Sequence, residues 1–245
     1  MAHKTKAKDS LGDEVAVLVG DSKSRRKRSA MPGADLAAYT CKELSKETWE
    51  DFAKLFSQGN GCDHCWCMHF QRACGLPREQ RLTRAARSRI NRREKKRLVE
   101  LDRAHGILVY AGGEPVGWCQ YGSREELPRI DNSRKYRLPA NTAVASGDGQ
   151  KLWRIACFTV LRTQRKRGVA SAALNAALKA IQKKGGGIVE AYPISRWEFY
   201  AFGNESTHGT ASMFEKVGFE TVASFGKTRF STHVLMRKTV PHAKS

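Results

Sequence analysis

The sequence contains no long run of apolar residues. None of its stretches approaches the roughly 18 apolar residues that a membrane-spanning helix needs. The first apolar run, 15–19, is short and follows two acidic residues, so we expect neither a secretory signal nor a membrane contact. Seven cysteines at uneven spacing are too few for a secreted disulfide scaffold. The composition therefore predicts a cytoplasmic protein with free thiols.

Acidic residues are scarce. The 245 residues include 24 Asp and Glu against 44 Lys and Arg, which gives a formal net charge of +20. Such a charge attracts polyanions, namely nucleic acid, an acidic partner or a phosphate-bearing cofactor. The basic residues gather in three clusters, at 23–28, 78–97 and 162–167. Each cluster needs its own explanation.

The chain divides into a tail and a single domain. Residues 1–35 mix Lys, Ser, Asp and Gly, and we predict a disordered basic tail there. Hydrophobic residues make up 40% of the sequence, so residues 36–245 can form one globular domain. Hydrophobic periodicity predicts helices over 45–58, 77–102, 168–184 and 209–217, and strands over 106–111, 115–121, 152–160, 188–192, 219–225 and 233–238.

The segment 152–174 is the most informative part of the sequence. It predicts a strand, a basic turn and a helix that opens at Gly168. The first turn of a helix offers unpaired N–H groups and the positive end of its dipole, and a glycine lets an anion approach the backbone. Neither a G-x-G-x-x-G fingerprint nor a Walker loop is present. The alternative is an ordinary strand–loop–helix with a solvated basic turn.

Arg165-x-x-Gly168-x-Ala170 resembles the coenzyme A pyrophosphate motif of the GNAT N-acetyltransferase superfamily. The order of the predicted elements and the ending Phe214-Glu-Lys-Val-Gly-Phe219 are similar to that superfamily over about residues 45–240. Four short motifs resemble those of one bacterial-type subgroup of the superfamily: Cys65-Trp-Cys-Met68, Val116-Gly-Trp-Cys119, Ala156-Cys-Phe158 and Glu190-Ala-Tyr-Pro193.

The resemblance implies an α+β fold with a mixed, mostly antiparallel sheet of about 6–7 strands, a V-shaped splay and about four helices. It also implies acetyl-CoA as co-substrate, with a backbone N–H at Phe158 or a neighbour holding the thioester carbonyl and the oxyanion. The expected cofactor-binding residues are Cys157, Phe158, Thr159, Val160, Arg165, Lys166, Arg167, Gly168, Val169, Ala170 and Ser171.

The amine must lose a proton before it attacks. We predict Glu190 as the general base, directly or through water, against the alternative of a structural glutamate. The family often protonates the departing thiolate with a tyrosine in its last helix, where this sequence has Phe214. Tyr192 is the predicted substitute, with Tyr200, Ser212 and water left open. A covalent intermediate on Cys157 is not favoured.

The cysteine segment 62–74 has two interpretations. Cys62, Cys65, Cys67 and His69 are zinc-ligand types, but no second pair of ligands follows, so zinc is not favoured. The preferred interpretation is a loop beside the acceptor pocket. The predicted acceptor-binding residues are Cys65, Trp66, Met68, Trp118 and Arg124.

The sequence predicts an N-acetyltransferase that acts on a primary amine of a small molecule in a ternary complex. The basic segment 78–97 leaves open a nucleic-acid or acidic-protein acceptor, with a solvated helix face as the simpler interpretation. A non-catalytic acyl-CoA sensor or nucleic-acid-binding protein on the same scaffold also stays open. The sequence sets no oligomeric state, and a homodimer is one of the options.

Overall fold

We describe the protein from a computed structural model of the whole chain. The residues described are 39–59, 62–76, 83–133, 136, 142, 151–197, 207–225 and 231–243. The predicted basic tail, the start of the predicted helix 77–102 and Tyr200 lie outside them. The division into a tail and a 36–245 domain therefore stays a prediction.

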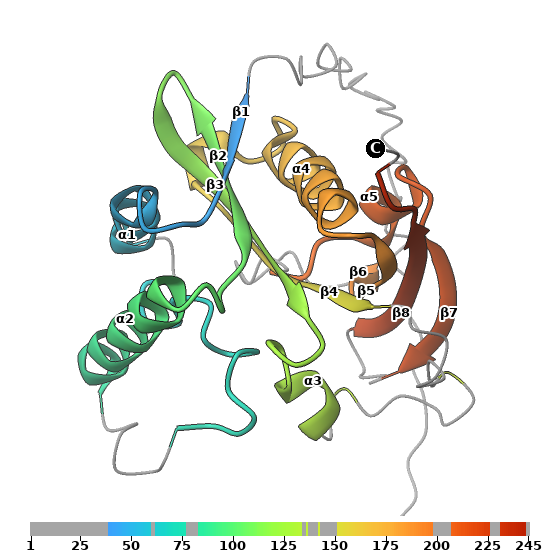
Figure 1. Cartoon of the computed structure of the whole chain (residues 1–245), viewed down its shortest axis with the longest axis horizontal. Coiled ribbons are helices and arrows are strands. Elements are labelled where there is room, and N and C mark those ends of the chain that lie inside the picture. The colour runs from blue at the N-terminus through green and yellow to red at the C-terminus, as the bar shows by residue number, and fades with distance from the viewer. Residues whose placement is uncertain are drawn as a thin grey trace, which may run out of the picture. The chain divides into compact units, whose positions relative to one another are not determined.

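Eight strands form one sheet (Figure 1). Their order is β1-β2-β3-β4-β5-β8-β6, and β7 also pairs with β8. Among these strands β4 and β5 are parallel and the other pairs are antiparallel. The bounds are β1 Thr40–Glu43, β2 Gly106–Ala111, β3 Glu114–Ser123, β4 Leu152–Val160, β5 Gly187–Ala191, β6 Ile194–Trp197, β7 Glu220–Phe225 and β8 Ser231–Val240.

Helices cover both faces of the sheet. The alternating residues of β2 divide accordingly, because Ile107 and Val109 pack in the core cluster of α4 while Leu108 and Tyr110 pack in that of α1. Figure 1 shows α4 lying along the sheet and α1 and α2 together on its other side. The helices are α1 Trp49–Ser57, α2 Arg84–Glu100, α3 Arg129–Asn132, α4 Val169–Lys183 and α5 Ala211–Glu215, with a 3₁₀ turn η5 over Arg162–Gln164.

β4 and β5 part from each other halfway along β4. Their parallel register runs from Leu152↔Ile188 to Ile155↔Ala191, where β5 ends. β4 continues to Val160 and keeps its pairing with β3. This splay and the mixed sheet confirm the predicted fold, although the sheet has one or two strands more than expected.

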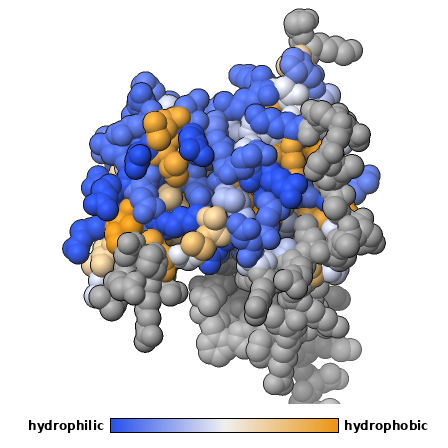
Figure 2. Space-filling view, turned by 60° about the horizontal axis from the view of Figure 1, so that its bottom comes forward, coloured by the Kyte–Doolittle hydropathy of each residue, from blue (hydrophilic) through white to orange (hydrophobic). Residues whose placement is uncertain are grey.

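The described surface is mostly hydrophilic. Figure 2 shows one face on which hydrophobic residues form small, separate patches. Within the described ranges, no helix has the length and apolar character required to cross a membrane.

Candidate active site

The basic turn between β4 and α4 has the conformation of an anion-binding turn. Gly168 is the N-cap of α4 and has a φ of +89°, and Lys166 has a φ of +59°. The left-handed conformation at Gly168 favours glycine, because a Cβ there is strained. The Arg165 side chain turns back and its Nε donates to the Val160 carbonyl at 3.1 Å. The side chains of Lys166 and Arg167, the two residues before Gly168, are exposed.

The edge of β4 beyond the splay carries the predicted thioester donor. The Phe158 N–H points to this edge, where it donates to the Thr207 carbonyl at 2.6 Å. The donor therefore exists where the sequence placed it, but the segment before α5 occupies it in this structure. Its use by a thioester stays a prediction and requires that the Thr207 carbonyl give way.

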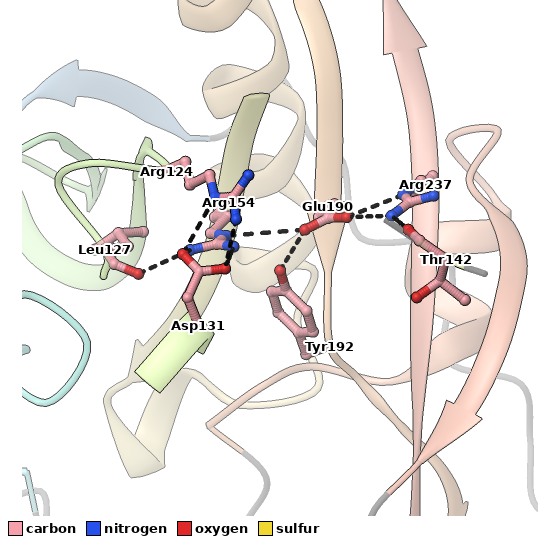
Figure 3. A network of polar contacts seen from close by, with 8 residues as sticks. All are labelled: Arg124, Leu127, Asp131, Thr142, Arg154, Glu190, Tyr192 and Arg237. Atoms are coloured by element: carbon pink, nitrogen blue, oxygen red, sulfur yellow. Dashed lines mark hydrogen bonds and ion pairs between the residues drawn. The ribbon is translucent and has the colours of Figure 1, made fainter. Parts of the chain in front are cut away.

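A network of charged side chains lies at the apex of the splay (Figure 3). Arg154 and Glu190 are register partners on β4 and β5, and each side chain is 2% exposed. The Arg154 guanidinium donates to Asp131 of α3 at 2.6 and 2.8 Å. Burial raises the pKa of the Asp131 carboxyl, but the hydrogen bonds and charge of Arg154 help to lower it below its ordinary value. Asp131 of α3 thus fixes the Arg154 side chain of β4 at the apex of the splay.

Glu190 accepts hydrogen bonds on both carboxylate oxygens. Arg237 of β8 donates to Oε1 at 2.6 and 2.9 Å, and the Tyr192 hydroxyl donates to Oε2 at 2.6 Å. Burial raises the pKa of Tyr192, so its hydroxyl stays a donor. These contacts give Glu190 a structural role at the apex. Its predicted role as the base, and that of Tyr192 as a proton donor, stay predictions.

The cysteine segment packs into the core beside α1 and α2. Trp66 is 3% exposed, Met68 2% and Trp118 0%, and the rings of Trp66 and Trp118 pack against Phe52 and Phe56. Their apolar character therefore serves the core in this structure, because no solvent-facing surface remains on Trp118. An acceptor role for Cys65, Trp66, Met68 and Trp118 stays a prediction.

The thiols of this segment lie close to β4. The Cys67 Sγ is 3.6 Å from the Cys157 Sγ and accepts from Trp118 Nε1 at 3.1 Å. Burial raises the pKa of Cys67 well above its usual value and that of Cys65 to about 11, so both thiols are protonated at neutral pH. Within the described residues, no group of three or more His, Cys, Asp or Glu side chains is arranged to hold a metal ion.

The two remaining predicted features are surface charges. Arg124 is paired with Asp131 at 3.3 Å and its side chain is 44% exposed. The helix α2 exposes Arg89, Arg92 and Arg93, and the Arg92 guanidinium lies 5.7 Å from the Trp66 ring centroid.

Two residues at the splay were not identified from the sequence, namely His208 and Tyr136. His208 Nδ1 lies 3.1 Å from the Ala156 carbonyl oxygen, and its Nε2 lies 3.1 Å from the Tyr136 hydroxyl. Each stands alone in a segment without periodicity, and 72 positions separate them in sequence. Only the fold brings them together.

A mixed sheet that opens between two parallel strands, with a basic turn leading from one of them into a helix, is the arrangement that the sequence resemblance implies. Residues 76–219, more than half of the chain, match the model of the Acetyltransferase (GNAT) family. The chain therefore belongs to this family. The family match does not show the motifs Cys-Trp-Cys-Met and Glu-Ala-Tyr-Pro as features of a subgroup, so the subgroup stays a prediction.

Solved structures of other acetyltransferases are similar to the chain. "Histone acetyltransferase HPA2 and related acetyltransferase" from Corynebacterium glutamicum is 12% identical, with 85% of this chain and 98% of that one covered and a TM-score of 0.47. A ribosomal-protein-S5-alanine acetyltransferase from Vibrio fischeri is 11% identical, with 85% and 96% covered and a TM-score of 0.44. A putative acetyltransferase from Salmonella typhimurium with its cofactor acetyl-CoA is 11% identical, with 84% and 97% covered and a TM-score of 0.46. No curated protein sequence matches the chain.

Proposed function

We propose that the protein transfers the acetyl group of acetyl-CoA to a primary amine, by direct attack of the amine in a ternary complex. The observation that carries the proposal is the succession of the β4 edge that lacks a β5 partner, the basic turn and the first turn of α4. Family membership supports the acetyl donor.

The residues along this succession fit a coenzyme A diphosphate. Gly168, with its left-handed backbone, begins α4, and a diphosphate would accept hydrogen bonds from the N–H groups of the first turn of this helix. The exposed side chains of Lys166 and Arg167 in the basic turn would add positive charge near the diphosphate. Residues 157–160 would pair with the pantetheine arm, since β4 has no β5 partner there. When bound, acetyl-CoA supplies the activated acyl group.

We infer a small-molecule acceptor from the side chains around the splay. Phe70, Tyr136 and Tyr192 belong to one buried cluster that reaches β4 at Ala156. These rings are 2–4% exposed, so an acceptor would meet them only at the edge of the cluster beside Ala156, which suits a compact, partly apolar amine rather than a long polymer. The exposed arginines of α2 support the second candidate, a polyanionic acceptor such as RNA or an acidic protein.

Calorimetry with acetyl-CoA at physiological salt tests the cofactor site. We expect micromolar binding to the wild type and none to the Gly168→Glu variant, because the new carboxylate repels the diphosphate and the left-handed position strains the turn. Gly112→Glu is the matched control. Gly112 also has a positive φ, +57°, but lies in the β2–β3 hairpin, and a Cβ there meets no atom within 4 Å. Equal binding by both variants would contradict the proposed site.

The salt dependence of turnover separates the two acceptor classes. Acetyl-CoA is offered with spermidine, kanamycin and an RNA oligonucleotide bearing a primary amine, and CoA release is followed. A polyanionic acceptor held by several arginines would lose affinity steeply as salt rises. Turnover of a small amine that changes little between 50 and 200 mM salt, roughly the range over which such contacts weaken, would support the small-molecule acceptor.

A further inference from the structure

His208 lies inside the splay with both ring nitrogens engaged. Its Nδ1 is 3.1 Å from the Ala156 carbonyl oxygen and its Nε2 is 3.1 Å from the Tyr136 hydroxyl. A carbonyl only accepts, so the neutral ring must carry its proton on Nδ1. Nε2 then has a lone pair, and the Tyr136 hydroxyl donates to it. The backbone of β4 therefore selects the tautomer that makes Nε2 a base.

The His208 ring contacts the same edge of β4 at which the acyl group would bind. Ala156 is the first β4 residue beyond the last β4–β5 register pair, Ile155↔Ala191. The residue before His208, Thr207, accepts from the Phe158 N–H on the same edge. When a thioester carbonyl takes that N–H, it displaces the Thr207 carbonyl. The two hydrogen bonds of the His208 ring involve other atoms.

Aromatic rings hold the imidazole in place. The ring centroid of His208 is 5.7 Å from that of Phe70, 6.1 Å from Tyr136 and 5.6 Å from His233, each in an edge-to-face arrangement. Tyr136 itself is 3% exposed. A base fixed among rings transfers a proton without the cost of being ordered during the reaction.

The hydroxyl of Tyr136 keeps its proton and is close to β4. Burial raises its pKa, and the nearby Cys157 raises it further, while Arg129 of α3 opposes both. Among the described residues, the titratable and charged groups that face the pair include Cys157 from β4, Arg129 from α3, Tyr192 after β5 and His233 from β8. Tyr136 serves as a proton conductor to His208 rather than as an acid that ionises alone.

We propose that His208 is a catalytic residue that moves a proton from the attacking amine to the departing sulfur through the Tyr136 hydroxyl. The proposal rests on the acetyl transfer proposed above and supplies the acid that Phe214 cannot. The acceptor first loses one proton to solvent, and its neutral amine forms the C–N bond to the thioester carbon. A second proton passes from nitrogen through Tyr136 to Nε2 of His208. The C–S bond breaks, and the imidazolium returns this proton to the CoA sulfur.

Steady-state kinetics with acetyl-CoA and the best amine of the panel test this step. We expect His208→Gln to lower kcat by roughly 100-fold, the usual contribution of a general acid–base residue, with little change in the KM for acetyl-CoA. The acidic limb of the kcat profile, where the imidazole takes a proton and Nε2 stops acting as a base, should disappear in this variant. Tyr136→Phe should lower kcat and remove that limb as well, because His208 reaches the amine only through the Tyr136 hydroxyl. His242→Gln, which changes an exposed histidine after the end of β8, should keep both kcat and profile.

A nitrogen-15 NMR spectrum of the imidazoles tests the same proposal without any acceptor. In the wild type at pH 7.5 we expect His208 to be neutral with its proton on Nδ1. A proton on Nε2, or a charged ring, would overturn the proposal, as would a His208→Gln variant with wild-type kcat and pH profile. Calorimetry of acetyl-CoA binding to the wild type distinguishes failure of the proposed function from failure of the role of His208. If acetyl-CoA does not bind, the proposed function is contradicted. If it binds normally and one of the overturning results above is found, only the role of His208 is contradicted.

Discussion

Arg154 should be the most sensitive position at the apex of the splay. Its side chain is 2% exposed, and it donates to Asp131 at 2.6 and 2.8 Å and to the Leu127 carbonyl at 3.0 Å. Removing one partner of a buried ion pair costs about 3–5 kcal/mol. Asp131 is 34% exposed and keeps Arg124, so the remaining charge is partly compensated. We therefore expect Arg154→Met to lower the free energy of unfolding by about 3 kcal/mol.

The control for this variant is Arg124→Met, which removes the other arginine from the same carboxylate. The Arg124 side chain is 44% exposed and lies 3.3 Å from Asp131, so its loss should cost about 0–1 kcal/mol. Urea unfolding followed by circular dichroism measures both. In a thermal scan, Arg154→Met should lower Tm by about 6–12 °C for a domain of this size. Equal losses for the two arginines would refute the reasoning from burial.

The same measurement has a pH dependence with a defined sign. Burial raises the pKa of Asp131, but the hydrogen bonds and charges of Arg154 and Arg124 together lower it below its ordinary value of about 3.9 in the folded protein. A carboxyl of this kind stabilises the fold above its unfolded pKa and loses that effect as the pH falls through the folded pKa. The difference between wild type and Arg154→Met should therefore be constant from pH 5 to 7 and shrink below about pH 4.

Three further outcomes are expected. Burial lowers the pKa of Lys95 to about 8, so this side chain binds more protons in the unfolded state than in the folded state between pH 8 and 10. The buried thiols of Cys65 and Cys67 act in the opposite direction, so the test is the difference in unfolding free energy between wild type and Lys95→Met in urea titrations. This difference should grow in favour of the wild type by an amount on the order of 3 kcal/mol from pH 8 to 10. A Cβ at Gly117 would lie 2.3 Å from Val169 Cγ1, so Gly117→Ala should cost about 1–3 kcal/mol in the same assay and shift the start of α4. Glu190→Gln should lower the unfolding midpoint because Arg237 loses its charged partner, and unchanged turnover at every pH would remove Glu190 from the proton transfer.

Elements with a strong internal pattern were predictable. The strand 152–160 coincides with β4, because its mostly apolar run follows Lys151 and ends just before the basic turn that begins at Arg162. β1 has no such pattern, since all four of its residues are exposed and only its pairing with β2 makes it a strand. The role of the cysteine segment was harder to predict, because its apolar residues indicate burial but do not say whether a core or a ligand pocket receives them. In the structure Trp66 and Trp118 share a core with Phe52.

The candidate site shows the same division between local signal and tertiary context. The turn at Gly168 is a contiguous motif whose conformation follows from its own residues, and it was identified. His208 gains its significance from two atoms elsewhere, the Ala156 carbonyl oxygen and the Tyr136 hydroxyl. No residue type or spacing within the segment around His208 indicates such partners. A lone histidine becomes a candidate only after the sheet has opened beside it.

The apex network explains why that opening can persist without a ligand. Two parallel strands that part expose N–H and C=O groups, and closing the gap would satisfy them. Arg154 and Glu190 form the next-to-last register pair, with Arg154 tied to Asp131 and Glu190 tied to Arg237. Moving either residue out of this register would separate a buried charge from its partner on α3 or β8, at a cost of several kcal/mol. The charges at the apex therefore fix the last register pairs before the splay, and the edge of β4 beyond them becomes available to the cofactor once the Thr207 carbonyl gives way.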